Sequence, residues 1–159
     1  MGAKAEGLAK RYEAKVQEAT SVMEKLSDAE WKKVTTAEKW PVGVVAHHMA
    51  NSHEGIAGII KTVASGQKMP PFSLDTLHEM NAKHAKEHAN CTKAETVALH
   101  KKNAAAAAAA VRGLDDAGLT KTASVLTGMP PMNVEQIVDR ILIHHMDEHV
   151  GSIRAAVGR

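Results

Sequence analysis

The sequence predicts an all-α protein, most simply an antiparallel four-helix bundle with one long connection and a split third helix. Apolar residues recur at helical spacing in three long segments, at about 4–26, 41–64 and 133–157. Helix-capping patterns precede several helical segments, and no alternating strand pattern of comparable strength occurs. At 159 residues, the chain is expected to form a single domain over positions 1–159.

The first half of the chain predicts two amphipathic helices joined by a short connector. Segment 4–26 places apolar residues between charged ones at helical intervals. A capping box, Ser-Asp-Ala-Glu at 27–30, opens a short helical turn, and 35–40 form the connector. A proline suits the first turn of helix 41–64. The apolar stripe of this second helix carries His48 near its middle.

The middle of the chain predicts a polar helix after a loop. Residues 65–72 contain paired prolines and a glycine, which favour a loop, and Ser73 can cap a helix from 74 to about 90. One face of this helix is unusually polar for a core stripe. Its residues are Leu77, Asn81, His84, His88 and Cys91.

Two further helices complete the expected bundle. Thr92 and Glu95 form a capping box for a helix that passes through the alanine run at 104–110. Alanine is the best helix former, so this run is expected to be ordered. Residues 115–131 are expected to be irregular, and Asn133, followed by Gln136, caps the last helix, which ends near 157.

Histidine spacing indicates a metal site. With 10 histidines, chance predicts roughly 0.6 His-x-x-x-His pairs, and the chain has two, His145/His149 and His84/His88. Residues four apart lie on one helix face and can share an ion. The first pair lies on a mostly apolar face, and His48 lies within another apolar stripe. We therefore predict that His48, His145 and His149 hold one divalent ion with an open fourth position; the alternative is three hydrogen-bonded core histidines.

Three short motifs are spread over most of the chain: Leu26-Ser-Asp-Ala-Glu-Trp31, Trp40-Pro-Val-Gly-Val-Val-Ala-His-His48, and His145-Met-Asp-Glu-His149-Val-Gly-Ser-Ile153. Through these motifs the sequence resembles the DinB/YfiT-like superfamily of metalloenzymes. The resemblance implies a four-helix bundle in which His48, His145 and His149 bind zinc or nickel. Members with a known activity act on low-molecular-weight thiols, and many are homodimers.

The function expected from these features is activation of water or of a low-molecular-weight thiol by the bound ion, in a hydrolase or a thiol S-transferase acting on a small molecule. The alternative is a non-enzymatic bundle, a stress-related dimer whose metal only stabilises the fold. A di-metal oxygen-using bundle needs Glu-x-x-His pairs, and no glutamate in this sequence has a histidine three residues later.

Several other polar residues have open assignments. Asn81 and His84 are candidates for lining a substrate or cofactor pocket, and the face that also includes His88 and Cys91 is alternatively a second metal site or simply solvent-exposed. His47 and His144 adjoin predicted ligands but lie about 100° away around their helices, so they are expected to flank the bundle or face solvent.

Composition excludes several classes of protein. The 20 basic and 18 acidic residues leave a net charge of +2 with no basic block, so nucleic acid is not an expected partner. The most apolar run, 42–63, contains three histidines and a glutamate, which is incompatible with a membrane span. The single cysteine, Cys91, cannot form an internal disulfide, and the N-terminus lacks an apolar signal core. We therefore expect a cytoplasmic protein.

Overall fold

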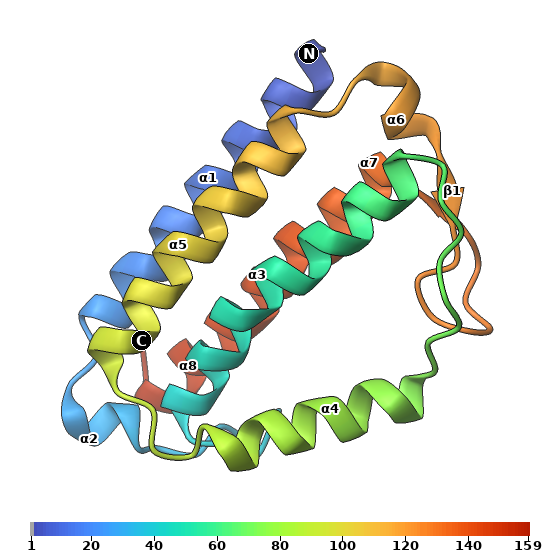
Figure 1. The fold of residues 1–159 in the computed structure, drawn as a ribbon. Coiled ribbons are helices and arrows are strands. Elements are labelled where there is room, and N and C mark those ends of the chain that lie inside the picture. Colours follow the sequence, from blue (N-terminus) through green and yellow to red (C-terminus); the bar gives the residue numbers. More distant parts are fainter. Residues whose placement is uncertain (1) are drawn as a thin grey trace.

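Four long helical segments form the body of the molecule within residues 2–159, the range that the computed structural model describes (Figure 1). They are α1 (Ala3–Glu24), α3 (Val42–Ala64), α5 (Lys93–Arg112) and the continuous run of α7 (Val134–Ile137), the π-helix η1 (Val138–Ile143) and α8 (His144–Val157). The predicted all-α four-helix bundle is confirmed.

The remaining elements are short or lie outside this body. They are α2 (Asp28–Trp31), α4 (Leu74–Glu87), α6 (Asp116–Thr120), β1 (Thr122–Ala123) and β2 (Met132–Asn133). The two strands pair in antiparallel fashion, so the segment expected to be irregular contains one helical turn and half of a very small sheet. The Asp115 side chain accepts a hydrogen bond from the Gly118 backbone N–H and thereby caps α6.

Side-chain caps begin the helices at the predicted positions. Reciprocal capping boxes are formed by Ser27 with Glu30, Thr92 with Glu95, and Asn133 with Gln136. Ser73 likewise accepts a hydrogen bond from the Thr76 backbone N–H at the start of α4. Each cap satisfies backbone N–H groups that have no partner inside the helix, which is why local sequence alone locates these helix starts.

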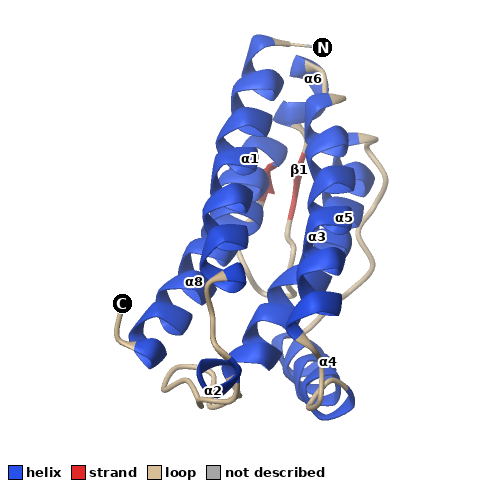
Figure 2. Cartoon of the chain, turned by 90° about the vertical axis from the view of Figure 1, so that its left-hand side faces the viewer, coloured by secondary structure: helices blue, strands red, loops and turns tan. Residues whose placement is uncertain are grey.

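Residues 65–73 and α4 make up the long connection between α3 and α5. Figure 1 shows that this connection returns the chain to the end of the bundle where α3 begins, so α5 runs parallel to α3. Helix α4 crosses that end, and Figure 2 views it nearly along its axis. No residue of α4 is buried, and all of them are described. The predicted split of the third helix therefore leaves only α5 in the bundle, because the polar face of α4 cannot enter an apolar core.

The alanine run lies within α5 and is ordered. Ala104, Ala107 and Ala108 are buried where α5 packs against α1 and α3. Alanine side chains allow helix axes to approach closely, so the run forms a contact surface with both neighbours. The expectation that this low-complexity stretch is an ordered helix is confirmed.

A buried chain of polar groups crosses the core between α1, α3 and α5. The Tyr12 hydroxyl lies 2.7 Å from Nδ1 of His53, and Nε2 of His53 lies 3.0 Å from Nδ1 of His100. This series of hydrogen bonds ends where Nε2 of His100 approaches the Val16 carbonyl oxygen at 3.3 Å. Both ring nitrogens of His53 and both of His100 therefore have a partner, which lets these two histidines occupy the interior without an ion.

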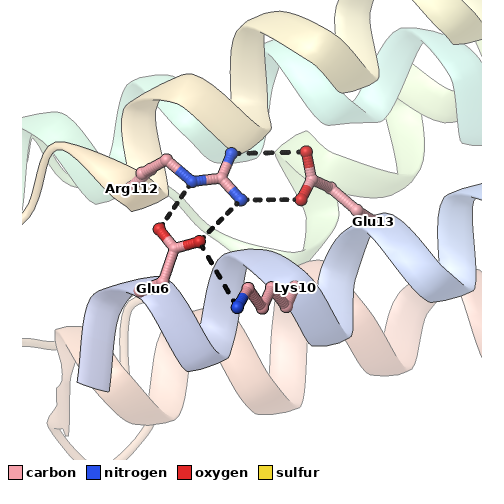
Figure 3. Close-up of polar contacts among 4 residues, drawn as sticks. All are labelled: Glu6, Lys10, Glu13 and Arg112. Carbon is pink, nitrogen blue, oxygen red and sulfur yellow. Dashed lines mark hydrogen bonds and ion pairs between the residues drawn. The ribbon is translucent and has the colours of Figure 1, made fainter. Parts of the chain in front are cut away.

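An ion-pair network joins the far end of α5 to α1 (Figure 3). The Arg112 guanidinium donates to Glu6 Oε2 through Nε and to Glu13 Oε1 through Nη2, each at 2.7 Å. Lys10 lies between the two glutamates on α1, with its Nζ 4.0 Å from Glu6 Oε1. The planar guanidinium can engage two carboxylates at once, so this contact helps to set the register of α5 along α1.

Candidate metal centre

The histidines at positions 48, 145 and 149 converge between α3 and α8. One candidate ligand nitrogen from each lies within 4.8 Å of the other two. The ring centroid of His48 is 5.1 Å from that of His145 and 4.9 Å from that of His149, and the last two centroids are 4.3 Å apart. Residues separated by about a hundred positions in the sequence thus form one compact cluster of imidazoles.

His48 is positioned by the start of α3. Pro41 precedes the first residue of the helix, and its φ of −56° suits helix entry. The Trp40 ring meets the His48 ring edge to face, with centroids 5.5 Å apart. Only 8% of the His48 surface is exposed. The tryptophan therefore restricts the rotation of the His48 ring.

The π-helix η1 lies directly before the histidines of α8. A π turn accommodates one extra residue, which rotates the following helix relative to the preceding one. Leu142, Ile143 and Met146 are all buried around this turn, and the His145 ring lies 5.1 Å from the His48 ring, centroid to centroid. Such insertions are frequent at functional sites. The apolar pattern of the sequence predicts a regular α-helix here and does not reveal the insertion.

A carboxylate supports His149. Glu38 Oε2 lies 2.7 Å from Nδ1 of His149, and both side chains are only 12% exposed. Burial is the largest single influence on Glu38 and opposes its ionisation, but polar contacts with His149, Thr35 and Ser152 together outweigh burial and hold its pKa below the usual value. The carboxylate occupies the Nδ1 side of the His149 ring, which leaves Nε2 to face His145.

The imidazoles of His48 and His145 are kept neutral. Burial, followed by the influence of neighbouring imidazoles, lowers the pKa of His48 and of His145 to about 3. Neutral imidazole is the form that binds metal ions. Nε2 of His145 lies 3.0 Å from Nε2 of His149, so two nitrogens that could bind a metal ion lie side by side.

This donor set fits a divalent transition-metal ion. Three imidazoles, one of them backed by a carboxylate, are the ligands of catalytic zinc sites that keep a further position open. Oε1 of Glu38 is buried and has no hydrogen-bond partner among residues 2–159. An uncompensated carboxylate oxygen beside neutral rings favours a cation nearby.

A model of the DinB superfamily matches residues 11–153, which is most of the chain. The chain belongs to the DinB superfamily. No curated protein matches the sequence.

Solved structures share the fold of this DinB-superfamily chain. YfiT from Bacillus subtilis, described as a probable metal-dependent hydrolase with an unusual four-helix bundle topology, is 16% identical with a TM-score of 0.76; the match covers 99% of this chain and 90% of YfiT. A mycothiol-dependent maleylpyruvate isomerase is 12% identical with a TM-score of 0.74. That match covers 96% of this chain but 63% of the isomerase, so the DinB-superfamily chain spans less than two thirds of that enzyme.

The pocket candidates of this DinB-superfamily chain lie on α4. Asn81 and His84 are half-buried, and the His84 ring lies 5.9 Å from the His48 ring, centroid to centroid. His84 therefore adjoins the candidate metal centre. Cys91 donates a hydrogen bond from Sγ to the Gly43 carbonyl at 3.3 Å, and burial raises the pKa of its thiol, which suppresses the reactive thiolate.

The prediction for His47 is wrong. It was expected to flank the bundle or face solvent, but only 7% of its surface is exposed. The reason is that α4 crosses the end of the bundle and covers the side of α3 that carries His47. His144 does face solvent, with 60% of its side chain exposed and an ion-pair contact to Glu148.

Sequence reasoning missed Glu38. This residue lies in the connector before α3, where one acidic residue among many polar ones carries no periodic signal. Its contact with His149 depends on a turn in which the Thr35 backbone N–H donates to the Trp40 carbonyl at 2.9 Å.

Within residues 2–159, none of the helices combines the length and the apolarity that crossing a bilayer requires.

Proposed function

We propose that this protein is a metal-dependent enzyme that holds one divalent ion, zinc or nickel, through His48, His145 and His149. The observation that supports the proposal is the convergence of three imidazoles within 4.8 Å, with Glu38 behind one of them. Structural metal sites usually have four protein ligands, and three protein ligands with an open position are typical of catalytic ones.

A divalent ion in this site supplies positive charge that lowers the pKa of a coordinated water or thiol and so favours the nucleophilic form. The protein's own residues prepare the site. Glu38 fixes the tautomer of His149, Trp40 restricts His48, and burial keeps His48 and His145 neutral. Neutral ligands leave the full charge of the ion available for this chemistry.

The reaction class that we propose is hydrolysis or thiol transfer on a small molecule. Two similar folds support this choice, since one is described as a probable metal-dependent hydrolase and the other as a mycothiol-dependent isomerase. The low identity to both leaves the substrate to be found by experiment. A zinc-loaded protein would be screened for ester and amide hydrolysis and, separately, for reaction of low-molecular-weight thiols with electrophiles.

A non-enzymatic role is the second candidate. It is favoured by the half-buried position of His145 and His149, which would suit an ion that only joins α8 to α3. Melting with and without a chelator separates the two roles. A large fall in Tm on chelation, with no turnover, supports a structural ion, whereas a metal-free protein that remains folded supports catalysis.

Metal analysis tests the ligand assignment. Wild type and His48→Ala would be stripped with a chelator, reloaded with Zn²⁺, dialysed and analysed for bound metal. We expect His48→Ala to hold one ion per chain fewer than wild type. His144→Ala is the matched control, because this exposed histidine adjoins a ligand without belonging to the cluster. Equal zinc content in His48→Ala and wild type would remove the basis of the proposal.

The proposed assembly follows the family resemblance, and the proposed compartment follows the composition of the sequence. We propose a homodimer that works in the cytoplasm, and sedimentation at several protein concentrations tests the assembly. The single half-buried cysteine has no partner for an internal disulfide, which is compatible with a reducing compartment.

A further inference from the structure

A second group of three histidines adjoins the candidate metal centre. His47, His84 and His88 each offer a ligand nitrogen within 4.8 Å of the other two. Successive residues on a helix point about 100° apart, so His47 faces α4 while its neighbour His48 faces α8. His84 and His88 are four residues apart, in the last turn of α4 and at its C-terminal cap, and point the same way.

The three rings are in direct contact. Nδ1 of His47 lies 2.8 Å from Nε2 of His84. The His47 and His88 rings stack with centroids 4.0 Å apart and an angle of 19° between their planes, and the His84 and His88 centroids are 4.6 Å apart. Two residues from α4 thus enclose one residue of α3, which is the arrangement that two helices need to share an ion.

The hydrogen bonding within this cluster leaves one buried nitrogen without a partner in the described part of the chain. One hydrogen bond between His47 and His84 satisfies two nitrogens, but Nδ1 of His84 is buried without a partner among residues 2–159. A hydrogen-bonded pair alone therefore does not account for the cluster.

Helix α4 lacks an apolar anchor. None of its described residues is buried; Leu74 and Met80 are each more than half exposed, and Leu77 is only partly buried. Helices in proteins are normally held by an apolar face that packs on a core. The histidine cluster is instead the side-chain contact through which the last turn of α4 meets α3.

We propose that His47, His84 and His88 form a second site for a divalent transition-metal ion, and that this ion fastens α4 to α3 beside the first centre. The site needs no ligand from the His48, His145 and His149 cluster, so it stands independently of the proposed function. The two clusters adjoin through His48 and His84, whose ring centroids are 5.9 Å apart. An ion at the second site would therefore fix the helix that borders the first.

Stoichiometry tests the second site. Wild type, His88→Ala, His149→Ala and the double variant would be stripped, reloaded with Zn²⁺ and analysed for metal per chain. We expect two ions in wild type, one in each single variant and none in the double variant. His78→Ala, an exposed histidine on the same helix, is the matched control and should keep two. His84→Ala provides a second test of the same site, and circular dichroism checks that each variant is helical.

Hydrogen exchange tests the fastening of α4. In the His149→Ala background, only the second site should respond to metal. With free Zn²⁺ at about 100 times its Kd, openings that break the site should become about 100-fold rarer, so exchange of amides in 74–87 should slow by about that factor. The same amides in His88→Ala should exchange at one rate with and without Zn²⁺.

The outcomes separate the two metal proposals. If His88→Ala and His84→Ala both bind as much zinc as wild type, the second site does not exist. If these variants each lose one ion while His149→Ala loses none, the second site stands and the first assignment fails. If the second ion binds but exchange of α4 does not change, the ion does not fasten the helix and that part of the inference is wrong.

Discussion

The Nδ1 atom of His149 lies 2.7 Å from Oε2 of Glu38, although 111 positions separate the two residues in the chain. This contact joins the connector before α3 to α8 and holds the His149 ring in one tautomer. Outer carboxylates of this kind typically alter metal affinity by about 10–100-fold. We therefore expect Glu38→Gln to weaken Zn²⁺ binding at the first centre by about that factor, measured by competition with a chromophoric chelator.

The control for this prediction is Glu148→Gln. Glu148 lies on α8 next to His149, but its side chain is 62% exposed. Its carboxylate contacts the exposed His144 and not the clustered histidines. Its replacement should leave zinc affinity unchanged, because an exposed charge is screened by solvent. If Glu38→Gln binds zinc as tightly as this control does, the carboxylate does not support the site.

Tyr12 provides a test of the buried polar chain. Tyr12→Phe leaves Nδ1 of His53 without its partner in the core, and an unsatisfied buried polar atom costs about 1–3 kcal/mol. We expect the free energy of unfolding in urea to fall by that amount. Thr62→Val removes an exposed hydroxyl that bonds to the Gly58 carbonyl and should change stability by less than about 0.5 kcal/mol. If the two variants were equally stable, the buried hydrogen bond between Tyr12 and His53 would not stabilise the fold.

Acid sensitivity follows from His53. Burial lowers the pKa of this imidazole to about 3 in the folded protein, below its ordinary value of 6.5. Between pH 6.5 and about 3, the His53 imidazole is therefore protonated in the unfolded protein but neutral in the folded protein. The stability from a neutral His53 is present above pH 6.5 and is lost as the pH falls toward 3, by about 1.4 kcal/mol per pH unit.

Urea unfolding at several pH values between 6 and 4 measures this loss. We expect His53→Gln to show a shallower fall of stability with decreasing pH than wild type, by about 1.4 kcal/mol per unit. The variant is also expected to be less stable at pH 7, because glutamine cannot reproduce both bonds of the imidazole. Parallel stability curves for the two proteins would show that His53 does not titrate as described.

Gly43 determines how α2 meets the start of α3. A Cβ at this position would overlap the indole of Trp31, whose Nε1 donates to the Cys91 carbonyl at 2.9 Å. Gly43→Ala should therefore displace Trp31, change its fluorescence and cost about 1–3 kcal/mol. Gly55→Ala, in the same helix with open space around its Cβ, should instead stabilise the protein by about 0.5–1 kcal/mol. Unfolding curves of both variants check the contrast.

Much of the fold could be predicted from short stretches of sequence. The caps at Ser27, Thr92 and Asn133 act on backbone groups within three residues, so their effect does not depend on the rest of the chain. The pairing of His145 with His149 is equally local, because residues four apart on a helix are neighbours. The alanine run in α5 is ordered for the same reason, namely intrinsic helix propensity.

The placement of α4 and the π turn before α8 could not be predicted from short stretches of sequence. Helix α4 has a capped start and good helical sequence whether or not it joins the bundle. Its polar face keeps it out of the core, but the place where it crosses the bundle depends on how the other helices pack. The η1 insertion changes the phase of α8 by one residue without changing the apolar composition. Both features depend on which surfaces meet in space.

The sequence by itself determined the helices, their caps and the pairing of His145 with His149 in α8, because these depend on neighbours a few residues apart. The tertiary structure alone decided that His47 turns to α4 and that Glu38 reaches His149. Those contacts form only when distant segments pack together, and a residue that acts through such a contact carries no local pattern that marks it in advance.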